Sequence, residues 1–312
     1  MSSSKAGNTS STLSELSSQL AAAVETAGNF VVAIHARRRI PSSGILWRPG
    51  VIVSASHTVR RDEDISVTLP SGESAAATIA GRDAATDLIA LHVTGAESHA
   101  AAKADAEAVR VGSLALAVGR PGRNVTASFG IISAVSDSWR SWQGGGARVD
   151  RVLRLDLAIY DGFSGGPLVD ASGAVLGLDN SALARGMPMA LPATAVDRVL
   201  DELLERGHVR RPFIGVAVQP VVLPASLVRQ HQLAHDTALL ILSVADASPA
   251  ESAGIIVGDA LLQANGQPLR RPTDLLDELS SAAHGSSLTL TFLRGGAVSS
   301  VSITPADRGA RA

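Results

Sequence analysis

Residues 161–170 of the chain read Asp-Gly-Phe-Ser-Gly-Gly-Pro-Leu-Val-Asp, and the glycine-rich part, 162–167, decides how the fold is interpreted. Glycine tolerates backbone conformations that strain other residues, so glycines on both sides of a serine allow a tight turn that exposes its hydroxyl. In such a turn the amides of Gly162 and Ser164 can together bind a developing oxyanion. The stretch therefore predicts that Ser164 is a nucleophile, and the alternative is a glycine-rich surface turn.

A serine hydroxyl reacts efficiently only when a base removes its proton and a third group orients that base. His57 follows the apolar, strand-like run 51–53, and Asp87 directly precedes a second such run, 88–91. Taken alone, a histidine at a strand end is more often structural, and an aspartate before a strand usually caps or turns. Their order along the chain, histidine, aspartate and then Ser164, with each beside a β-type run, is the order that a two-barrel serine protease requires.

The segments around these three residues resemble the HtrA family of serine proteases. Residues 54–59 (Ser-Ala-Ser-His-Thr-Val) are similar to the family's Thr-Asn-x-His-Val, and residues 86–91 (Thr-Asp-Leu-Ile-Ala-Leu) to its Thr-Asp-Leu-Ala-Val-Leu. Residues 155–168 resemble a third family segment, which ends in Gly-Asn-Ser-Gly-Gly-Pro-Leu. The resemblance extends from about residue 12 to residue 305. It implies a mainly β fold, a chymotrypsin-like double β-barrel followed by an α+β PDZ domain.

The resemblance also implies a role for each residue of the site. Ser164 would be the nucleophile, His57 the general base and then the general acid, and Asp87 the group that orients His57. The amides of Gly162 and Ser164 would form the oxyanion hole. Phe163 departs from the family pattern, which has asparagine before the nucleophile. This difference affects how the oxyanion turn packs but removes no member of the triad.

Family analogy implies a primary specificity pocket lined by Ile159 and Met189. No charged residue stands at positions 158 and 159, so an arginine or lysine side chain would find no counter-ion there. A small or medium aliphatic residue before the scissile bond is therefore expected.

The last third of the chain resembles a bacterial PDZ domain in residues 213–216, 248–255 and 258–266. An extended peptide would add as a strand between the first strand and a helix, with its terminal carboxylate bound by backbone amides. The peptide-binding residues implied by the resemblance are Phe213, Ile214, Gly215, Val216, Leu275 and Leu279.

The expected organisation begins with a helix whose start is marked by a capping box, Thr12 to Glu15. Short β-type runs separated by turn residues then continue to residue 193, as an all-β domain requires. The expected parts are a disordered polar tail at 1–11, a protease domain at 12–208 (helix 12–27, first barrel about 30–100, second barrel about 110–193, connecting helix 194–207), a PDZ domain at 209–305 and a tail at 306–312.

Composition excludes several classes of function. Hydrophobic residues make up 46% of the chain and charged residues 18%, which suits packed cores and not a disordered chain. A formal net charge of −2 gives no reason to expect nucleic acid as a partner. The absence of cysteine rules out disulfides and thiolate metal sites, and the sequence has no His-Glu-x-x-His motif. Neither a metal nor another cofactor is expected.

The amino-terminal residues 1–11 are rich in serine and lack the apolar core of a signal peptide. No stretch approaches the ~18 apolar residues of a transmembrane helix. The sequence therefore places the protein in the cytoplasm unless a leader is missing, although the HtrA family is usually periplasmic or exported.

Two functions are consistent with these patterns. The first is an ATP-independent serine endopeptidase that cleaves unfolded or damaged proteins, with a PDZ domain that binds C-terminal or extended peptides for substrate recruitment or allosteric activation. The alternative is a catalytically weak, PDZ-bearing peptide sensor or holdase. The resemblance also implies a homotrimer formed through the amino-terminal region, where Phe30 is the aromatic residue nearby.

Overall fold

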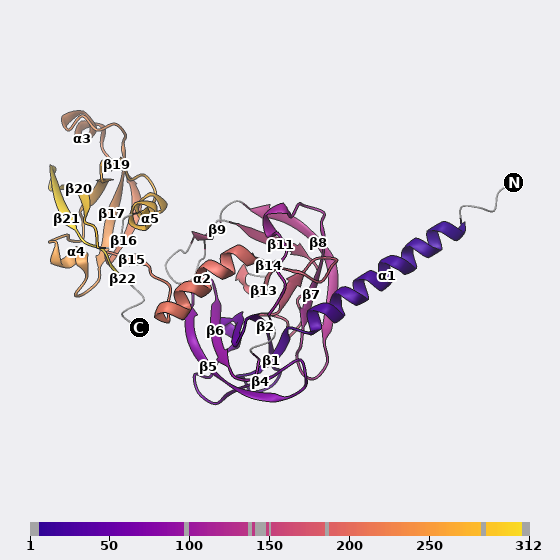
Figure 1. The fold of residues 1–312 in the computed structure, drawn as a ribbon. Helices are drawn as coiled ribbons and strands as arrows, with labels where there is room; N and C mark the ends of the chain where they lie inside the picture. The colour runs from indigo at the N-terminus through magenta and orange to yellow at the C-terminus, as the bar shows by residue number, and fades with distance from the viewer. Residues whose placement is uncertain are drawn as a thin grey trace. The chain divides into compact units, whose positions relative to one another are not determined.

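The computed structural model describes residues 6–96, 100–136, 139–140, 148–149, 151–184, 187–281 and 285–307. The chain divides into two compact units, one ending at Val209 and the other beginning at Arg210. The first unit contains two closed barrels, and the second contains a six-stranded sheet, a two-stranded sheet and helices (Figure 1). The fold is therefore mainly β, as predicted.

The first barrel closes in the strand order β1-β2-β3-β6-β5-β4. All residues of β3 are buried, because β2 and β6 pair with it on either side. The register places Ala55 opposite Leu88, so the ends of β3 and β6 bring His57 and Asp87 to the same edge. The strands are β1 (Val31–His35), β2 (Ser42–Arg48), β3 (Val51–Ala55), β4 (Ile65–Thr68), β5 (Ser74–Asp83) and β6 (Leu88–Val93).

The second barrel closes in the order β11-β14-β13-β12-β7-β8 and contains Ser164 in the turn before β12. A separate two-stranded ribbon pairs β9 (Trp139–Arg140) with β10 (Arg148–Val149). The barrel strands are β7 (Leu114–Gly119), β8 (Thr126–Ser136), β11 (Val152–Asp156), β12 (Pro167–Val169), β13 (Val175–Ala184) and β14 (Met187–Pro192).

The amino-terminal helix α1 (Ala6–Gly28) is longer than the sequence predicted. The expected start at Thr12 is wrong, and residues 6–11 are helical and not a disordered tail. No proline lies between Ala6 and Thr12, so nothing in the chain interrupts the helical hydrogen bonds before the capping box. The remainder of the expected tail, 1–5, lies outside the described residues.

The connecting helix α2 (Ala193–Arg206) ends at Gly207, whose left-handed φ of 78° suits a helix C-cap. Its Asp197 accepts hydrogen bonds from Trp47 Nε1 and Lys103 Nζ, both at 2.7 Å. These contacts fasten the helix to the outside of the first barrel.

The second unit contains a sheet in the order β16-β17-β18-β20-β21, so β16 is an edge strand. The strand β22 pairs with β15, and residues 306–307 therefore belong to this unit and not to the expected tail. Its elements are β15 (Pro212–Phe213), β16 (Val216–Val222), α3 (Ala225–Gln230), β17 (Thr237–Val244), α4 (Pro249–Ser252), β18 (Ala260–Ala264), β19 (Gln267–Pro268), α5 (Pro272–Ser281), β20 (Leu288–Arg294), β21 (Ala297–Ile303) and β22 (Ala306–Asp307).

Candidate active site

His57 and Asp87 form a hydrogen-bonded pair at the edge of the first barrel. A short 3₁₀ turn, Ser56–Thr58, carries His57 immediately after β3. His57 Nδ1 lies 2.5 Å from Asp87 Oδ2, and the His57 amide donates to Asp87 Oδ1 at 2.8 Å. The Asp87 side chain is 10% exposed and the His57 side chain 35% exposed. The carboxylate therefore fixes the ring, while the imidazole remains open to a substrate.

The backbone conformation around Asp87 directs its carboxylate toward His57. Asp87 has a left-handed φ of 56°, a conformation that aspartate tolerates better than most residues. The Asp87 carbonyl accepts a hydrogen bond from the Ser56 amide at 2.8 Å. The buried carboxylate of Asp83 accepts a hydrogen bond from the Thr86 amide at 3.1 Å and so closes the turn.

Ser164 lies in a turn whose backbone leaves two amides available. Gly162 and Gly165 have φ values of 90° and 92°, in the left-handed region that favours glycine. The Gly162 carbonyl accepts from Ser43 Oγ at 2.6 Å and is therefore held in one direction. Among the described residues, the amides of Gly162 and Ser164 donate no hydrogen bond. Both amides are free for an oxyanion.

The same turn packs against the end of β3, from which His57 follows. A Cβ atom added to Gly165 would overlap Ser54 Oγ and would lie 2.7 Å from the Ala55 amide nitrogen. Only glycine allows this approach. The close contact places the nucleophile turn of the second barrel beside the residues that lead into His57.

Two consecutive residues of β13 connect the members of the site. Asn180 Nδ2 donates to Asp87 Oδ2 at 2.8 Å. The next residue, Ser181, has its Oγ 2.8 Å from Ser164 Oγ, and its amide donates to the same Ser164 oxygen at 3.3 Å. Asp87 and Ser164 belong to different barrels, and each is bonded to one of two adjacent residues of β13.

The Ser164 hydroxyl is bonded to Ser181 and not to His57. In the described part of the chain no hydrogen bond joins Ser164 to His57. The hydrogen bond between His57 and Asp87 that the predicted triad requires is thus present, whereas the Ser164 hydroxyl is directed toward Ser181. Catalytic hydrogen bonds are often unmade or long without substrate, and a rotation of the serine side chain would change its partner.

Comparison with known proteins identifies the architecture. Residues 42–178 match the family model of the trypsin-like peptidase domain, and residues 212–304 match that of the PDZ domain. The solved structure of the serine endoprotease from Yersinia pestis superposes with a TM-score of 0.72 at 26% identity, covering 92% of this chain and 97% of that chain. The HtrA-type protease AlgW with tripeptide gives a TM-score of 0.70 at 26% identity, covering 93% and 97%. A Brucella suis protein named probable periplasmic serine endoprotease DegP-like is 32% identical over 290 residues, 88% of this chain and 55% of that relative.

The chain belongs to the HtrA family. This HtrA chain spans about half the length of the curated relatives it matches. The family resemblance seen in the sequence is confirmed, together with the order of a trypsin-like domain followed by a PDZ domain.

Neither Asn180 nor Ser181 was predicted from the sequence of this HtrA chain. The apolar run that marks the strand ends at residue 178, whereas β13 extends to Ala184. Residues 179–181 read Asp-Asn-Ser directly after an apolar run. Polar residues that continue a buried strand could have indicated that these side chains belong to the site. Such side chains need partners, and those of Asn180 and Ser181 are the predicted site residues Asp87 and Ser164.

The neighbouring residue, Asp179, has a buried carboxyl group, and its main chain is bonded to the turn that contains Ser164. Its amide donates to the Gly166 carbonyl at 2.8 Å, and its carbonyl accepts from the Gly165 amide at 2.9 Å. Its side chain is fully buried, and neither carboxyl oxygen has a hydrogen-bond partner in the described residues. Burial raises the pKa of Asp179 well above the ordinary value, because the ionised form would lose its hydration.

The two residues expected in the specificity pocket lie in different apolar clusters. Ile159 is half-buried and packs with the interior of the second barrel, which includes Ala190. Met189 is 5% exposed and packs with the larger cluster that contains α2. Adjacent residues of a strand point to opposite faces, so Met189 and Ala190 diverge. The pocket formed by both residues stays a prediction.

The expected peptide groove of the PDZ unit is partly realised. The helix α5 lies against β15 and β16, and β16 has a free sheet edge. Phe213 and Val216 are half-buried, whereas Gly215 has a φ of 87° and approaches Ser248 closely. Ile214, Leu275 and Leu279 are at most 4% exposed and pack together in the core of the unit. These three side chains support the groove from within, and their contact with a peptide stays a prediction.

Phe163, which replaces the family's asparagine, packs inside the protein. The ring is 2% exposed and meets the Tyr160 ring edge-on, with centroids 5.4 Å apart and an interplanar angle of 84°. It also covers Gly119, where an added Cβ would lie 2.8 Å from the ring. The substitution therefore anchors the oxyanion turn through apolar contacts.

Within the ranges that the structure describes, no group of three or more histidine, aspartate or glutamate side chains could hold a metal ion. No helix among those residues is both long enough and apolar enough to cross a membrane.

Proposed function

We propose that this chain is an ATP-independent serine endopeptidase that cleaves unfolded or damaged proteins. The observation that carries the proposal is the pair of contacts from adjacent residues, Asn180 to Asp87 and Ser181 to Ser164. These contacts, together with the His57–Asp87 hydrogen bonds, support a site in which His57 is the base, Asp87 orients it and Ser164 supplies the hydroxyl. The family's fold and the names of its relatives support the same reaction.

The proposed mechanism begins when the Ser164 hydroxyl leaves Ser181 and turns to His57 Nε2. His57 takes its proton as the oxygen attacks the scissile carbonyl, while Asp87 stabilises the imidazolium. The free amides of Gly162 and Ser164 bind the oxyanion. His57 then protonates the leaving amine, and water, deprotonated by His57, releases the acyl-enzyme.

Peptide binding by the PDZ unit would recruit substrates or activate the enzyme. An extended peptide can pair with the open edge of β16, beside α5, and place its carboxylate at the amides of residues 213–215. Val216 and Val218 direct their side chains to the core, so pairing with β16 rests on its main chain. The solved AlgW structure is described as being with a tripeptide, which supports this mode for the chain.

A homotrimer formed through α1 is part of the proposal. Leu13 is 68% exposed and Leu16 is 36% exposed on this helix, whereas Phe30 is 5% exposed and unavailable for contact. Light scattering should give the mass of three copies, and Leu13→Glu with Leu16→Glu should lower it. A monomer in the unaltered protein would rule the trimer out.

The periplasm is the compartment that the relatives support, in place of the cytoplasm expected from the sequence. The Brucella relative is named a periplasmic protein. Cell fractionation of the naturally expressed protein would test this, and recovery only in the cytoplasmic fraction would contradict it.

The decisive test of the function uses an unfolded substrate such as casein, without ATP. The unaltered protein should degrade it, and an added peptide with an apolar C-terminus should change the rate. Ser164→Ala should abolish cleavage and still bind the peptide. Peptide binding by an unaltered protein that never cleaves would instead favour the peptide sensor or holdase.

A further inference from the structure

A pocket of about 700 Å³ beside the candidate active site is lined mainly by arginine. It contains Arg37, Arg38, Arg39, Arg60 and Arg61, with Asp161 as its acidic member. The arginines come from two segments of the first barrel, which are joined where the Arg60 amide donates to the Ala36 carbonyl at 3.1 Å. The chain as a whole has a net charge of −2, so this concentration of positive charge is local.

The positive charges in the pocket are poorly compensated. In the described ranges, Arg38, Arg39, Arg60 and Arg61 make no side-chain hydrogen bond or ion pair. Arg37 is occupied, because its guanidinium donates to the carbonyls of the loop that follows it. Burial lowers the pKa of Arg37, Asp161 opposes that shift and Arg60 adds to it. Arginine stays charged at any physiological pH, so like charges remain together in the pocket.

The pocket adjoins both halves of the reaction site. A Cβ atom on Gly162 would lie 2.8 Å from the Pro41 carbonyl oxygen and 3.2 Å from Ile40 Cγ2, so the arginine loop touches the oxyanion turn. Asp161 directly precedes Gly162 in the chain, and Arg60 follows His57 by three residues. A substrate bound across this site would pass close to the arginines.

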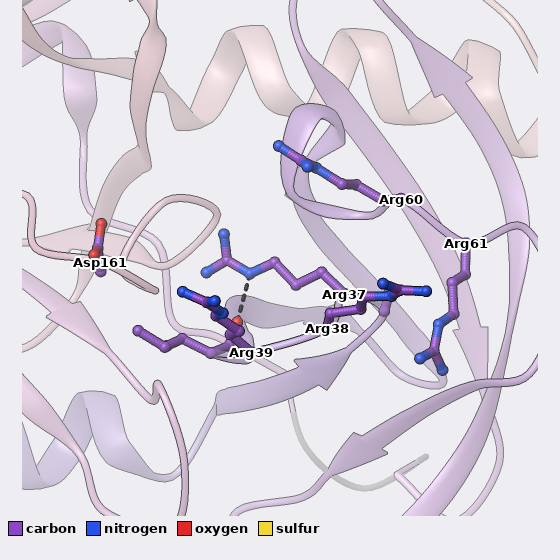
Figure 2. A pocket seen from close by; sticks show the side chains of 8 residues that line it. Arg37, Arg38, Arg39, Arg60, Arg61 and Asp161 are labelled. Atoms are coloured by element: carbon purple, nitrogen blue, oxygen red, sulfur yellow. Dashed lines mark hydrogen bonds between the residues drawn. The ribbon is translucent and has the colours of Figure 1, made fainter.

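The arginine side chains of the pocket point in different directions. Figure 2 shows Arg37, Arg39 and Arg60 extending toward the side of the pocket where Asp161 lies, whereas Arg38 extends away from it and Arg61 points downward in this view. Arg39 and Arg60 therefore combine an orientation toward the oxyanion turn with an unused guanidinium.

We propose that this arginine pocket binds acidic side chains of the substrate on the leaving-group side of the scissile bond. The inference rests on the proposed endopeptidase function. His57 must protonate the leaving nitrogen, so the chain after the scissile bond passes on the side of His57 and of Arg60. Arginine binds carboxylates in a bidentate manner, and uncompensated guanidinium groups favour such partners.

A polypeptide fits this pocket better than a nucleic acid. Binding to a nucleic acid backbone uses an extended basic stripe that neutralises successive phosphates. Here the basic residues are confined to one pocket, and Asp161 at its edge would repel a continuous polyanion. An extended peptide with separate acidic side chains meets less of that repulsion than a continuous polyanion does.

The test compares cleavage of two peptides that differ only after the scissile bond, one with aspartate and glutamate and the other with asparagine and glutamine. The unaltered protein should prefer the acidic peptide by about tenfold in kcat/KM at low salt, and the preference should shrink as added salt screens it. Arg39→Gln with Arg60→Gln should reduce the ratio to about twofold or less. The control is Arg110→Gln with Arg229→Gln, two exposed positions that do not line the pocket, which removes the same net charge and should keep the ratio.

A second variant should raise the preference for the acidic peptide instead of lowering it. Asp161→Asn removes the carboxylate that repels the acidic peptide and should raise the ratio several-fold. A ratio near one in the unaltered protein, an equal fall in both double variants, or an acidic preference only before the scissile bond would overturn the inference. Salt-sensitive binding of duplex DNA, lost in the arginine variant without any peptide preference, would also overturn it. Cleavage of the neutral peptide tests the endopeptidase itself, so the two failures are distinguishable.

Discussion

Replacing Asp179 with asparagine should change how the stability of the peptidase unit depends on pH. The Asp179 carboxyl is fully buried, its oxygens have no hydrogen-bond partner in the described residues, and burial raises its pKa well above the ordinary value. Asparagine has nearly the same shape and does not titrate. The substitution therefore removes the titration and leaves the packing around Gly165 and Gly166 close to unchanged.

The sign and size of the effect follow from proton linkage. Above about pH 4 the unfolded chain releases this proton, whereas the folded protein retains it until the pH reaches the raised pKa. The contribution to stability is thus complete below about pH 4 and is lost as the pH rises from there through the folded pKa. Within that window the free energy of unfolding should fall by about 1.4 kcal/mol per pH unit.

The assay is urea unfolding at several pH values, in a Ser164→Ala background that prevents self-digestion. Tryptophan fluorescence reports on the peptidase unit alone, because Trp47, Trp139 and Trp142 all precede residue 210. Asp156→Asn, at an exposed position of the same barrel, controls for the loss of one charge. The difference in unfolding free energy between Asp179→Asn and its parent should grow with pH. The same pH dependence in both proteins would refute the reasoning.

Three further predictions concern the reaction. Asn180→Ala removes a hydrogen bond to the Asp87 carboxylate and should lower kcat about tenfold, roughly the worth of one such bond to a charged group; an unchanged kcat on an ester substrate would contradict this. Ser181→Ala frees the Ser164 hydroxyl from its resting partner and should raise kcat several-fold, whereas a fall would assign Ser181 a supporting role. Gly165→Ala requires a side chain at a φ of 92° and against backbone atoms, so it should abolish activity and lower the melting temperature, and normal turnover would show that the turn is not tight.

Short apolar runs separated by turn residues predicted an all-β domain. The resemblance to the HtrA family implied that this domain is a double barrel. The resemblance to the HtrA family also implied that Asp87 orients His57. His57 follows β3 and Asp87 precedes β6, and the register of these two strands brings the two residues together.

Other features depend on contacts that periodicity does not reveal. The pairing of Asn180 with Asp87 requires that two separate barrels meet at a particular register. The pairing of Ser181 with Ser164 depends on how β13 pairs with β12 within the second barrel. The arginine pocket likewise forms only because a backbone hydrogen bond joins segments more than twenty residues apart. Leu279 was predicted to contact a bound peptide but lies in the core of its unit. Apolar residues at helical spacing fit the wall of a groove and the core of a domain equally well, so the sequence could not distinguish the two.

The most direct test of the central claim is to locate the covalent label left by a fluorophosphonate probe, which reacts with activated serine hydroxyls. Mass spectrometry of the digested protein should find the label on Ser164, and its rate of appearance should fall sharply in His57→Ala. Absence of label from the folded protein, or label on a different serine with Ser164 unmodified, would contradict the proposed catalytic site.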